Sequence, residues 1–433
     1  MSKKIALINP PSPFLINERV AYNSGLMRVA TQLNADGHDA KIYDLAGNKD
    51  YMNTIKDIAR QDFDLYGFSA TSPQFTSVYK MFHTLKQENP NARTLIGGPH
   101  ANAVGSLRKK GIKDHNIYAL GEFDTIYQGE AELGNANKMF EDGWVDGGLV
   151  KKIDDTLHPD RSLMDILSYV YNLNGKKTTN IQTQRGCPNV CTFCCGRDID
   201  IYRKVRQHSP ERVVEEMDRL NKDYGYESFM WYDDEVNVNI SRLEKLCKEL
   251  KDKPYQHRGF VTSDQIVKYP ESVKWMKDAG FVKLCTGVES GSDRILERIG
   301  KKTTYDINKK AREIIGEHGI HYEAFLIVGH PSETKEDIEK TKQFIEEVKP
   351  DDFDINILTP YPGSKIYNEA KESDEIKGYN FESNGLFFNK PNYAIDETYY
   401  KGLDAQSASN VRTREISNAE LFEIRNKIQR MRK

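Results

Sequence analysis

Four of the chain's six cysteines lie within nine residues, in the segment RGCPNVCTFCCG at 185–196. Three of them, Cys187, Cys191 and Cys194, have the spacing CxxxCxxC, so a single loop can bring their thiols to one cluster. A cubane 4Fe–4S cluster held by three thiolates keeps one iron without a protein ligand. A structural cluster needs four cysteines, whereas an open iron can bind a substrate. The spacing therefore predicts a 4Fe–4S cluster with one open coordination site.

Other uses of these thiols are consistent with the spacing. A structural zinc site with a remote His or Cys, and a disulfide pair, are the two alternatives. Cys195 could replace Cys194 or supply a fourth ligand, but neighbouring side chains point apart, and we interpret it as a thiol packed beside the cluster. Cys285 falls in an expected strand and Cys247 in an expected helix, and both are interpreted as core residues.

The composition is that of a soluble globular enzyme, with 38% apolar and 29% charged residues. The 62 basic and 65 acidic residues give a net charge of -3, which argues against a general nucleic-acid or membrane-surface binder. No apolar run is long enough to cross a membrane, and the run IALI at 5–8 is too short for a signal peptide. We therefore expect a cytoplasmic protein, in whose reducing environment clustered cysteines more often bind a metal.

Strand-like apolar runs alternate with helical patterns over residues 3–132. This alternation predicts a doubly wound, Rossmann-like parallel sheet, which binds ligands at the carboxyl ends of its strands. Three expected strand ends carry small or polar residues, at 9–11, 69–72 and 97–100. Gly97 and Gly98 would let a bulky ligand approach the backbone, although ordinary strand–helix turns explain these segments equally well. No GxGxxG motif is present, so dinucleotide binding is disfavoured.

This first third resembles the cobalamin-binding domain found in front of many radical S-adenosylmethionine enzymes, above all in IGGPHANA at 96–103 and YQGEAE at 127–132. The resemblance implies a cobalamin site at the three strand ends, formed by Asn9, Ser69, Thr71, Gly97, Gly98 and His100. Classical cobalamin domains carry a cobalt-ligating His in a DxHxxG motif after the first strand. The corresponding segment here, NPPSPFLINERV at 9–20, has no His, so bound cobalamin would lack a protein imidazole on cobalt. Some relatives keep the fold and lose the cofactor.

Strand–helix units also repeat after the cysteines, up to residue 368. They predict a partial TIM-type (β/α) barrel, whose sites lie at the carboxyl ends of the strands. The cysteine loop follows the first expected strand, so the cluster would lie at that end. Carboxylates stand at two further strand ends, Asp233 and Asp234 in one and Glu289 in the other. Helix capping or a solvated loop would also explain these carboxylates.

The CxxxCxxC spacing, with Phe193 before the last ligand, resembles the radical S-adenosylmethionine superfamily. Its branch with an N-terminal cobalamin domain resembles this chain further in TGVESGSDRILERIGKKTT at 286–304 and FLIVGHPSET at 325–334. In this superfamily the open iron chelates S-adenosylmethionine, which an electron from the cluster cleaves to a 5′-deoxyadenosyl radical. The resemblance implies that Tyr232, Asp233 and Asp234 hold the amino end of S-adenosylmethionine. It also implies that Glu289 and Ser290 contact the ribose or methionyl part.

Together these features predict a cobalamin-binding-like domain at 1–140, a linker at 141–175, a radical S-adenosylmethionine barrel at 176–368 and a C-terminal extension at 369–433. By resemblance the activity is methyl transfer to an unactivated carbon of a small molecule, with an electron donor such as flavodoxin or ferredoxin as partner. A radical rearrangement, ring contraction or epimerisation on the same scaffold is the second hypothesis. A non-catalytic cobalamin or iron–sulfur sensor is the third, and the open iron argues against it.

Overall fold

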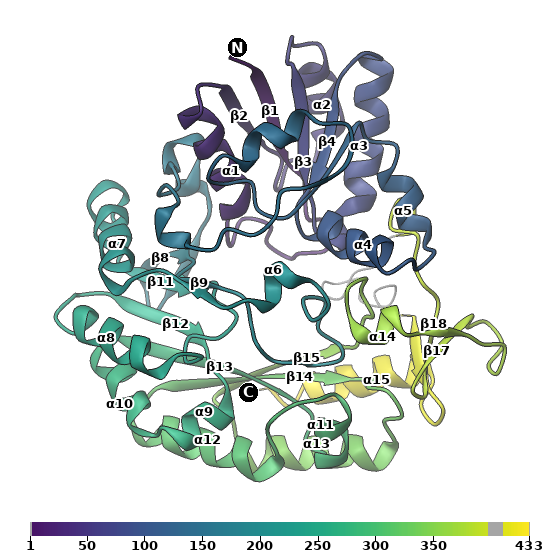
Figure 1. The fold of residues 1–433 in the computed structure, drawn as a ribbon. Coiled ribbons are helices and arrows are strands. Elements are labelled where there is room, and N and C mark those ends of the chain that lie inside the picture. The colour runs from purple at the N-terminus through teal and green to yellow at the C-terminus, as the bar shows by residue number, and fades with distance from the viewer. Residues whose placement is uncertain (1, 397–409, 433) are drawn as a thin grey trace.

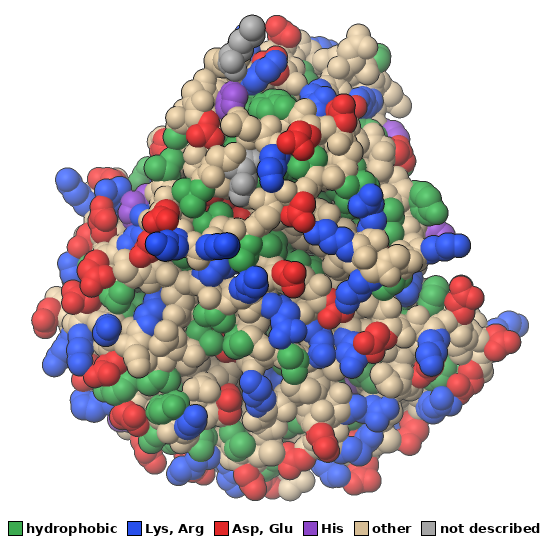
Figure 2. Space-filling model, in the orientation of Figure 1, with side chains coloured by type: hydrophobic (Ala, Val, Ile, Leu, Met, Phe, Trp, Pro, Cys, Tyr) green, Lys and Arg blue, Asp and Glu red, His purple; other side chains and the backbone are tan. Residues whose placement is uncertain are grey.

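Two parallel sheets organise the chain in the computed structural model, which describes residues 2–396 and 410–432. Figure 1 shows the N-terminal sheet above a second, curled sheet, with the short helix α6 (Asp200–Arg203) between them. Basic and acidic side chains are mixed over the face in Figure 2, in keeping with the small net charge. Among the described residues, no helix combines the length and the apolar character that a membrane span needs.

The N-terminal sheet has six parallel strands in the order β2-β1-β3-β4-β5-β6. The strands are β1 (Lys4–Asn9), β2 (Asp39–Asp44), β3 (Leu65–Ser69), β4 (Thr94–Gly97), β5 (Thr125–Gln128) and β6 (Gly143–Asp146). The helices are α1 (Ser24–Ala35), α2 (Tyr51–Ala59), α3 (Phe75–Glu88), α4 (Pro99–Lys109) and α5 (His115–Leu120). Apolar clusters cover both faces of the sheet, as in a doubly wound fold, and the strand order reverses between β1 and β3. The predicted fold class of this region is confirmed.

The segment 141–175, expected to be a linker, contains parts of both sheets. Its residues 143–146 form β6, the sixth strand of the N-terminal sheet, and β7 (Tyr171–Leu173) pairs antiparallel with β8. Strand β6 has only four residues and begins at Gly143, whose φ is +76. So short a strand shows little of the apolar pattern by which strands are recognised in a sequence. The domain boundary expected at residue 140 therefore precedes the sixth strand of the N-terminal sheet, and the one expected at 176 falls between two paired strands of the second sheet.

The second sheet has the order β15-β14-β13-β12-β11-β8-β7, and all its strands except β7 run parallel. Its strands are β8 (Lys176–Ile181), β11 (Ser228–Trp231), β12 (Gln256–Phe260), β13 (Phe281–Glu289), β14 (His321–Val328) and β15 (Asp352–Ile357). The outer helices are α7 (Pro210–Tyr224), α8 (Ile240–Leu250), α9 (Ser263–Lys268), α10 (Glu271–Asp278), α11 (Asp293–Arg298), α12 (Tyr305–Glu317) and α13 (Lys335–Val348). The short helix α14 (Lys365–Asn368) follows β15 and lies beside the cysteine loop, where the Ile366 amide donates to Thr192 O at 3.1 Å. Helix α7 starts at Ser209-Pro210 and ends at Gly225 in the left-handed region, as the sequence predicts. The sheet curls into a half-barrel, which confirms the predicted partial barrel.

The C-terminal extension forms a small antiparallel sheet and one helix. The strands are β16 (Lys371–Glu372), β17 (Phe381–Ser383), β18 (Leu386–Phe388) and β19 (Val411–Thr413), and helix α15 (Asn418–Gln429) contacts β15. Ser417 and Glu420 form the capping box that starts α15. Residues 391–396 dock on the N-terminal domain, where the Tyr393 amide donates to Asn116 Oδ1 at 2.9 Å. Part of the aromatic-rich segment, residues 397–409, lies outside the described residues.

His257 on β12 generates a prediction about acid stability. Its ring is fully buried against Phe229 and Phe281, and burial lowers its pKa to about 3. The unfolded chain binds a proton there near pH 6.5, so the folded state loses stability as the pH falls from about 6.5 towards 3. The free energy of unfolding of His257→Phe, measured by urea titration, should therefore fall less between pH 7 and pH 5 than that of the natural protein. Equal losses in the two proteins would contradict this.

Candidate functional site

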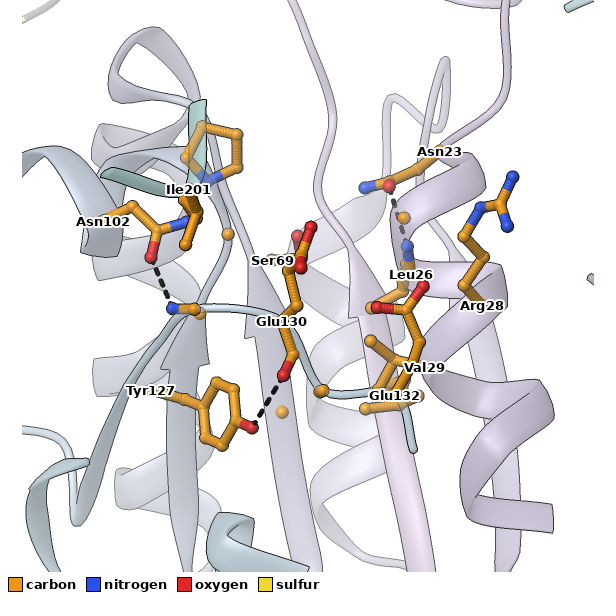
Figure 3. Close-up of a pocket in the computed structure, with 18 of the residues that line it drawn as sticks. Asn23, Leu26, Arg28, Val29, Ser69, Asn102, Tyr127, Glu130, Glu132 and Ile201 are labelled. Atoms are coloured by element: carbon orange, nitrogen blue, oxygen red, sulfur yellow. Dashed lines mark hydrogen bonds between the residues drawn. The ribbon is translucent and has the colours of Figure 1, made fainter. Parts of the chain in front are cut away.

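A cavity of about 350 Å³ lies at the carboxyl ends of the N-terminal strands, between the two domains. Figure 3 shows part of its wall, with Leu26 and Val29 from α1, Tyr127 from β5 and Glu130 and Glu132 from the loop after β5. The second domain closes the cavity with four residues, Gln182, Arg185, Ile201 and Tyr202. The cavity is therefore an interdomain site at the expected edge of the sheet.

Glycines keep this cavity open where the strands end. Gly98 has φ +85, and a Cβ there would lie 2.7 Å from the Ser69 side chain, so only glycine fits. Gly97 is not in the left-handed region, and a Cβ there would have ordinary contacts of 3.6 Å or more. Three of the residues predicted for a cobalamin site, Ser69, Gly97 and Gly98, line this cavity together.

The other three predicted residues, Asn9, Thr71 and His100, lie outside the lining of this cavity. Asn9 is buried and donates to Asp44 at 2.8 Å, so it ties β1 to β2. Thr71 caps the short turn after β3. His100 is fully buried, 2.9 Å from Ser72 Oγ and stacked on Phe75, and burial lowers its pKa to about 3. Sequence reasoning located the strand ends correctly but not the direction in which each side chain points.

The cysteine loop connects the two strands of a short antiparallel hairpin. Strand β9 (Gln184–Arg185) pairs antiparallel with β10 (Arg206–Gln207), and the three predicted ligands lie between these strands. The Cys187 amide donates to Tyr202 O at 2.9 Å, and the Cys194 amide donates to Cys191 O at 3.2 Å. Cys187 and Cys191 are half-buried and Cys194 is exposed. The loop follows β8, at the expected end of the half-barrel.

No three His, Cys, Asp or Glu side chains are arranged around a single metal ion in residues 2–396 and 410–432. A cubane places each thiolate on a different iron, so its ligands do not have to converge on one point. Burial raises the pKa of Cys191 to about 11, and burial and Glu235 raise the pKa of Cys187 further. The free thiols are thus protonated, and metal binding must displace their protons. Cys195 is exposed, whereas Cys247 and Cys285 are buried, as expected.

Asp233, predicted to hold S-adenosylmethionine, accepts hydrogen bonds from the chain just before the cysteine loop. Its carboxylate accepts from the Thr183 amide at 2.6 Å and the Gln184 amide at 2.9 Å, and also from the Thr183 hydroxyl. The side chain is buried, beside the guanidinium of Arg242. Both carboxylate oxygens are therefore engaged in fixing the chain just before the cysteine loop.

The neighbours of Asp233 face the cysteines. Asp234 is exposed, and its charge contributes to raising the pKa of Cys187. Glu235, which sequence reasoning missed, is buried and accepts from the Cys187 thiol at 3.2 Å and from Asn189. Tyr232 is 44% exposed. Of the predicted trio, Tyr232 and Asp234 are therefore the exposed members.

Glu289 and Ser290 have different environments at the end of β13. Glu289 adopts φ +66, is buried, and lies 3.6 Å from the ammonium of Lys301. Burial raises the pKa of Glu289, and Lys301 opposes that shift. Ser290 is fully buried, where it accepts from the Ser292 amide at 3.1 Å and lies 3.4 Å from Thr341 Oγ1. Ser290 therefore holds the turn that follows β13.

Lys301 was not predicted, because it stands outside any strand-end motif. It lines a small pocket with Cys191, Gly287 and residues that follow β12, at the mouth of the half-barrel. The charges of Glu235 and Glu289 both act on its ammonium. A cation and two buried carboxylates thus surround the cysteine loop on the barrel side.

Comparison with known proteins identifies a family for each of the two domains. Residues 181–345 match the radical SAM superfamily, and residues 18–124 match the B12 binding domain. The chain therefore carries a B12-binding domain followed by a radical SAM domain, the two domains that the sequence predicts.

Among similar proteins, an uncharacterized methyltransferase of Pyrococcus horikoshii is 29% identical over 85% of this chain and 83% of its own length. The anaerobic magnesium-protoporphyrin IX monomethyl ester cyclase of Cereibacter sphaeroides is 26% identical over 73% of this chain and 54% of its own length. The methyltransferase TsrM of Kitasatospora setae, solved with cobalamin and a [4Fe-4S] cluster, has the same fold, with a TM-score of 0.61. The two sequences are 16% identical, and the match covers 85% of this chain and 74% of TsrM.

The structural role of Asp233 generates a prediction. Asp233→Asn keeps one oxygen for the two amides but replaces the oxygen that accepts from the Thr183 hydroxyl by a donor, and it removes the negative charge beside Arg242. A buried hydrogen bond is therefore lost, and the free energy of unfolding should fall by about 1–3 kcal/mol. The exposed neighbour offers a matched control, because Asp234→Asn should change that free energy by less than about 0.5 kcal/mol. Both values come from urea titration at pH 7. Equal effects of the two changes would return Asp233 to the ligand-binding role.

Proposed function

We propose that this protein is a cobalamin-dependent radical S-adenosylmethionine methyltransferase that acts on an unactivated carbon of a small molecule. The observation that carries the proposal is the interdomain cavity, because it brings the wall of the B12-binding domain to the loop of the predicted cluster ligands. When bound, the cluster and S-adenosylmethionine supply a 5′-deoxyadenosyl radical and cobalamin carries the methyl group.

The cavity residues fit part of a cobalamin. Leu26, Val29 and Tyr127 offer apolar contact, and the glycines at 97 and 98 leave room beside the strand ends. Arg28 lines the same cavity and is buried, and its Nε and Nη1 have no hydrogen-bond partner among the described residues. A buried guanidinium needs acceptors, which the amides and phosphate of a cobalamin provide. We assign Ser69, Gly97, Gly98 and Arg28 to this cofactor.

We assign the cluster to Cys187, Cys191 and Cys194, and S-adenosylmethionine to the pocket beside Cys191. Lys301 of that pocket suits the methionyl carboxylate. Glu289, 3.6 Å from Lys301, suits the amino group or ribose together with Asp234 or Glu235, although these three carboxylates lie outside the pocket lining. A reductant must reach the cluster, and a small acidic redox protein such as flavodoxin or ferredoxin would serve.

A second function is a radical reaction without methyl transfer on the same scaffold. The similarity to the cyclase of Cereibacter sphaeroides favours it, because a cyclase closes a ring. Retained cobalt alone does not separate the two functions, whereas transfer of a labelled methyl group from S-adenosylmethionine to a substrate does.

The cluster assignment predicts the metal content. Protein purified without oxygen should hold about four irons per chain, since three thiolates can anchor one cubane. Cys187→Ala, Cys191→Ala and Cys194→Ala should each lose this iron, and Cys195→Ala should keep it. Iron and sulfide analysis measures the outcome. Loss of iron in Cys195→Ala alone would show that the ligand set is wrong.

The assignment of Glu289 predicts an effect on S-adenosylmethionine binding. Glu289→Gln should lose a charge-assisted interaction worth about 1.5–3 kcal/mol and weaken binding about ten- to a hundredfold, with the iron content unchanged. Glu297→Gln on the exposed side of α11 is the control and should bind normally. Equilibrium dialysis against the cluster-loaded protein gives both affinities. Unchanged affinity in Glu289→Gln would leave Glu289 with a structural role only.

The proposed function is tested by cobalt retention. The protein is loaded with hydroxocobalamin, freed of excess by gel filtration, and analysed for cobalt, with one cobalt per chain expected. Gly97→Leu should abolish retention by filling the cavity, and Gly97→Ala should keep it, because a Cβ there has room. We choose Gly97 over Gly98, whose left-handed φ would strain any larger residue. Absence of cobalt from the natural protein would refute a cobalamin-dependent reaction.

A further inference from the structure

The hairpin that carries the cysteine loop has an unfavourable charge pattern at its base. Arg185 on β9 and Arg206 on β10 are direct cross-strand partners. Both side chains are buried, with 11% and 6% exposed. Like charges placed opposite each other in an antiparallel pair destabilise it, and burial strengthens the repulsion. This base therefore depends on negative charges supplied by another part of the chain.

Two carboxylates of the N-terminal domain supply those charges. Glu130 lies between the two arginines, 2.8 Å from Arg185 Nη1 and 2.5 Å from Arg206 Nη1. Glu132 accepts from Arg185 through both oxygens, at 2.5 Å and 3.2 Å. These four residues, called the Glu–Arg network below, bridge the two domains.

The same carboxylates form one wall of the interdomain cavity. Both belong to the loop after β5, and Figure 3 shows them beside Ser69 and Leu26. The loop is itself fixed by hydrogen bonds, from the Gly129 amide to Asn102 at 2.8 Å and from the Tyr127 hydroxyl to Glu130 O at 3.3 Å. A molecule in the cavity would therefore contact the carboxylates that hold the base of the hairpin. One residue of that base, Arg185, lies two positions before Cys187.

We propose that the Glu–Arg network couples occupancy of the cavity to the geometry of the cysteine loop, with Arg185 as the positioning residue. The proposal rests on cobalamin as the occupant, as in the proposed function. A ligand that orders the loop after β5 favours one position of the Glu130 and Glu132 carboxylates. Arg185 contacts both carboxylates, so their position influences where the adjoining residues Gly186 and Cys187 lie. Since S-adenosylmethionine binds the cluster that this loop carries, its affinity reports the coupling. By thermodynamic linkage, cobalamin and S-adenosylmethionine then each strengthen the binding of the other.

The test is a double measurement on cluster-loaded protein. The dissociation constant of S-adenosylmethionine is determined with and without hydroxocobalamin, and cobalt and iron are counted in each sample. For the natural protein we expect hydroxocobalamin to tighten S-adenosylmethionine binding at least about fivefold, the lower end of typical coupling. Arg185→Gln and Glu132→Gln should retain cobalt and iron but reduce this factor to about one. Arg185→Lys should give an intermediate factor, because an ammonium does not span two carboxylates as a guanidinium does.

A control removes a different contact between the two domains. The Tyr367 hydroxyl donates to Asp114 Oδ2 at 2.6 Å, and neither residue lines the cavity. Tyr367→Phe should therefore keep the full coupling factor, which separates the network from general loosening of the interface. If Arg185→Gln fails to assemble a cluster, the near-isosteric Glu132→Gln tests the coupling in its place.

Two results would overturn the coupling while leaving the proposed function intact. One is cobalt retention by the natural protein with no change in S-adenosylmethionine affinity. The other is a factor in Glu132→Gln equal to that of the natural protein, which would indicate direct contact between the two ligands. Absence of retained cobalt in the natural protein would overturn the proposed function, and the coupling with it.

Discussion

The ion pairs between Glu130 and Glu132 of one domain and Arg185 and Arg206 of the other are the constraint on which the site depends. Two arginines opposite each other do not form a stable hairpin base alone, so the cysteine loop acquires its position only when the domains meet. Buried ion pairs contribute little net stability, but loss of one partner costs about 3–5 kcal/mol because a buried charge remains. The interface therefore fixes where the loop lies more than it stabilises the fold.

The two parallel sheets meet through their carboxyl ends at this interface. Both fold types place ligands at that edge, so the facing sheets bring two ligand sites together. Tyr202 shows how close they are. Its side chain lines the cavity and accepts from Asn102 at 2.9 Å, while its carbonyl accepts from the Cys187 amide at 2.9 Å. One residue thus contacts the cobalamin-type domain and the cysteine loop at once.

Local patterns in the sequence predicted both sheets, the cysteine loop and the glycines at 97 and 98, because strand ends and ligand spacing are local properties. The directions of individual side chains were not predictable in this way. Asn9 and His100 stand at the predicted strand ends but are engaged inside the N-terminal domain, and Asp233 faces the hairpin. Lys301, Glu235 and the Glu–Arg network were missed because their roles arise from contacts between segments distant in the sequence.

The central claim is that a cobalamin in the interdomain cavity and a cluster on Cys187, Cys191 and Cys194 lie next to each other. Electron paramagnetic resonance on protein loaded with both groups tests it directly, since cob(II)alamin and the reduced cluster each carry an unpaired electron. The account predicts that reducing the cluster broadens the cob(II)alamin signal and speeds its relaxation, and that Cys191→Ala, which lacks the cluster, shows neither change. A cob(II)alamin signal that is the same with and without the reduced cluster would contradict the account.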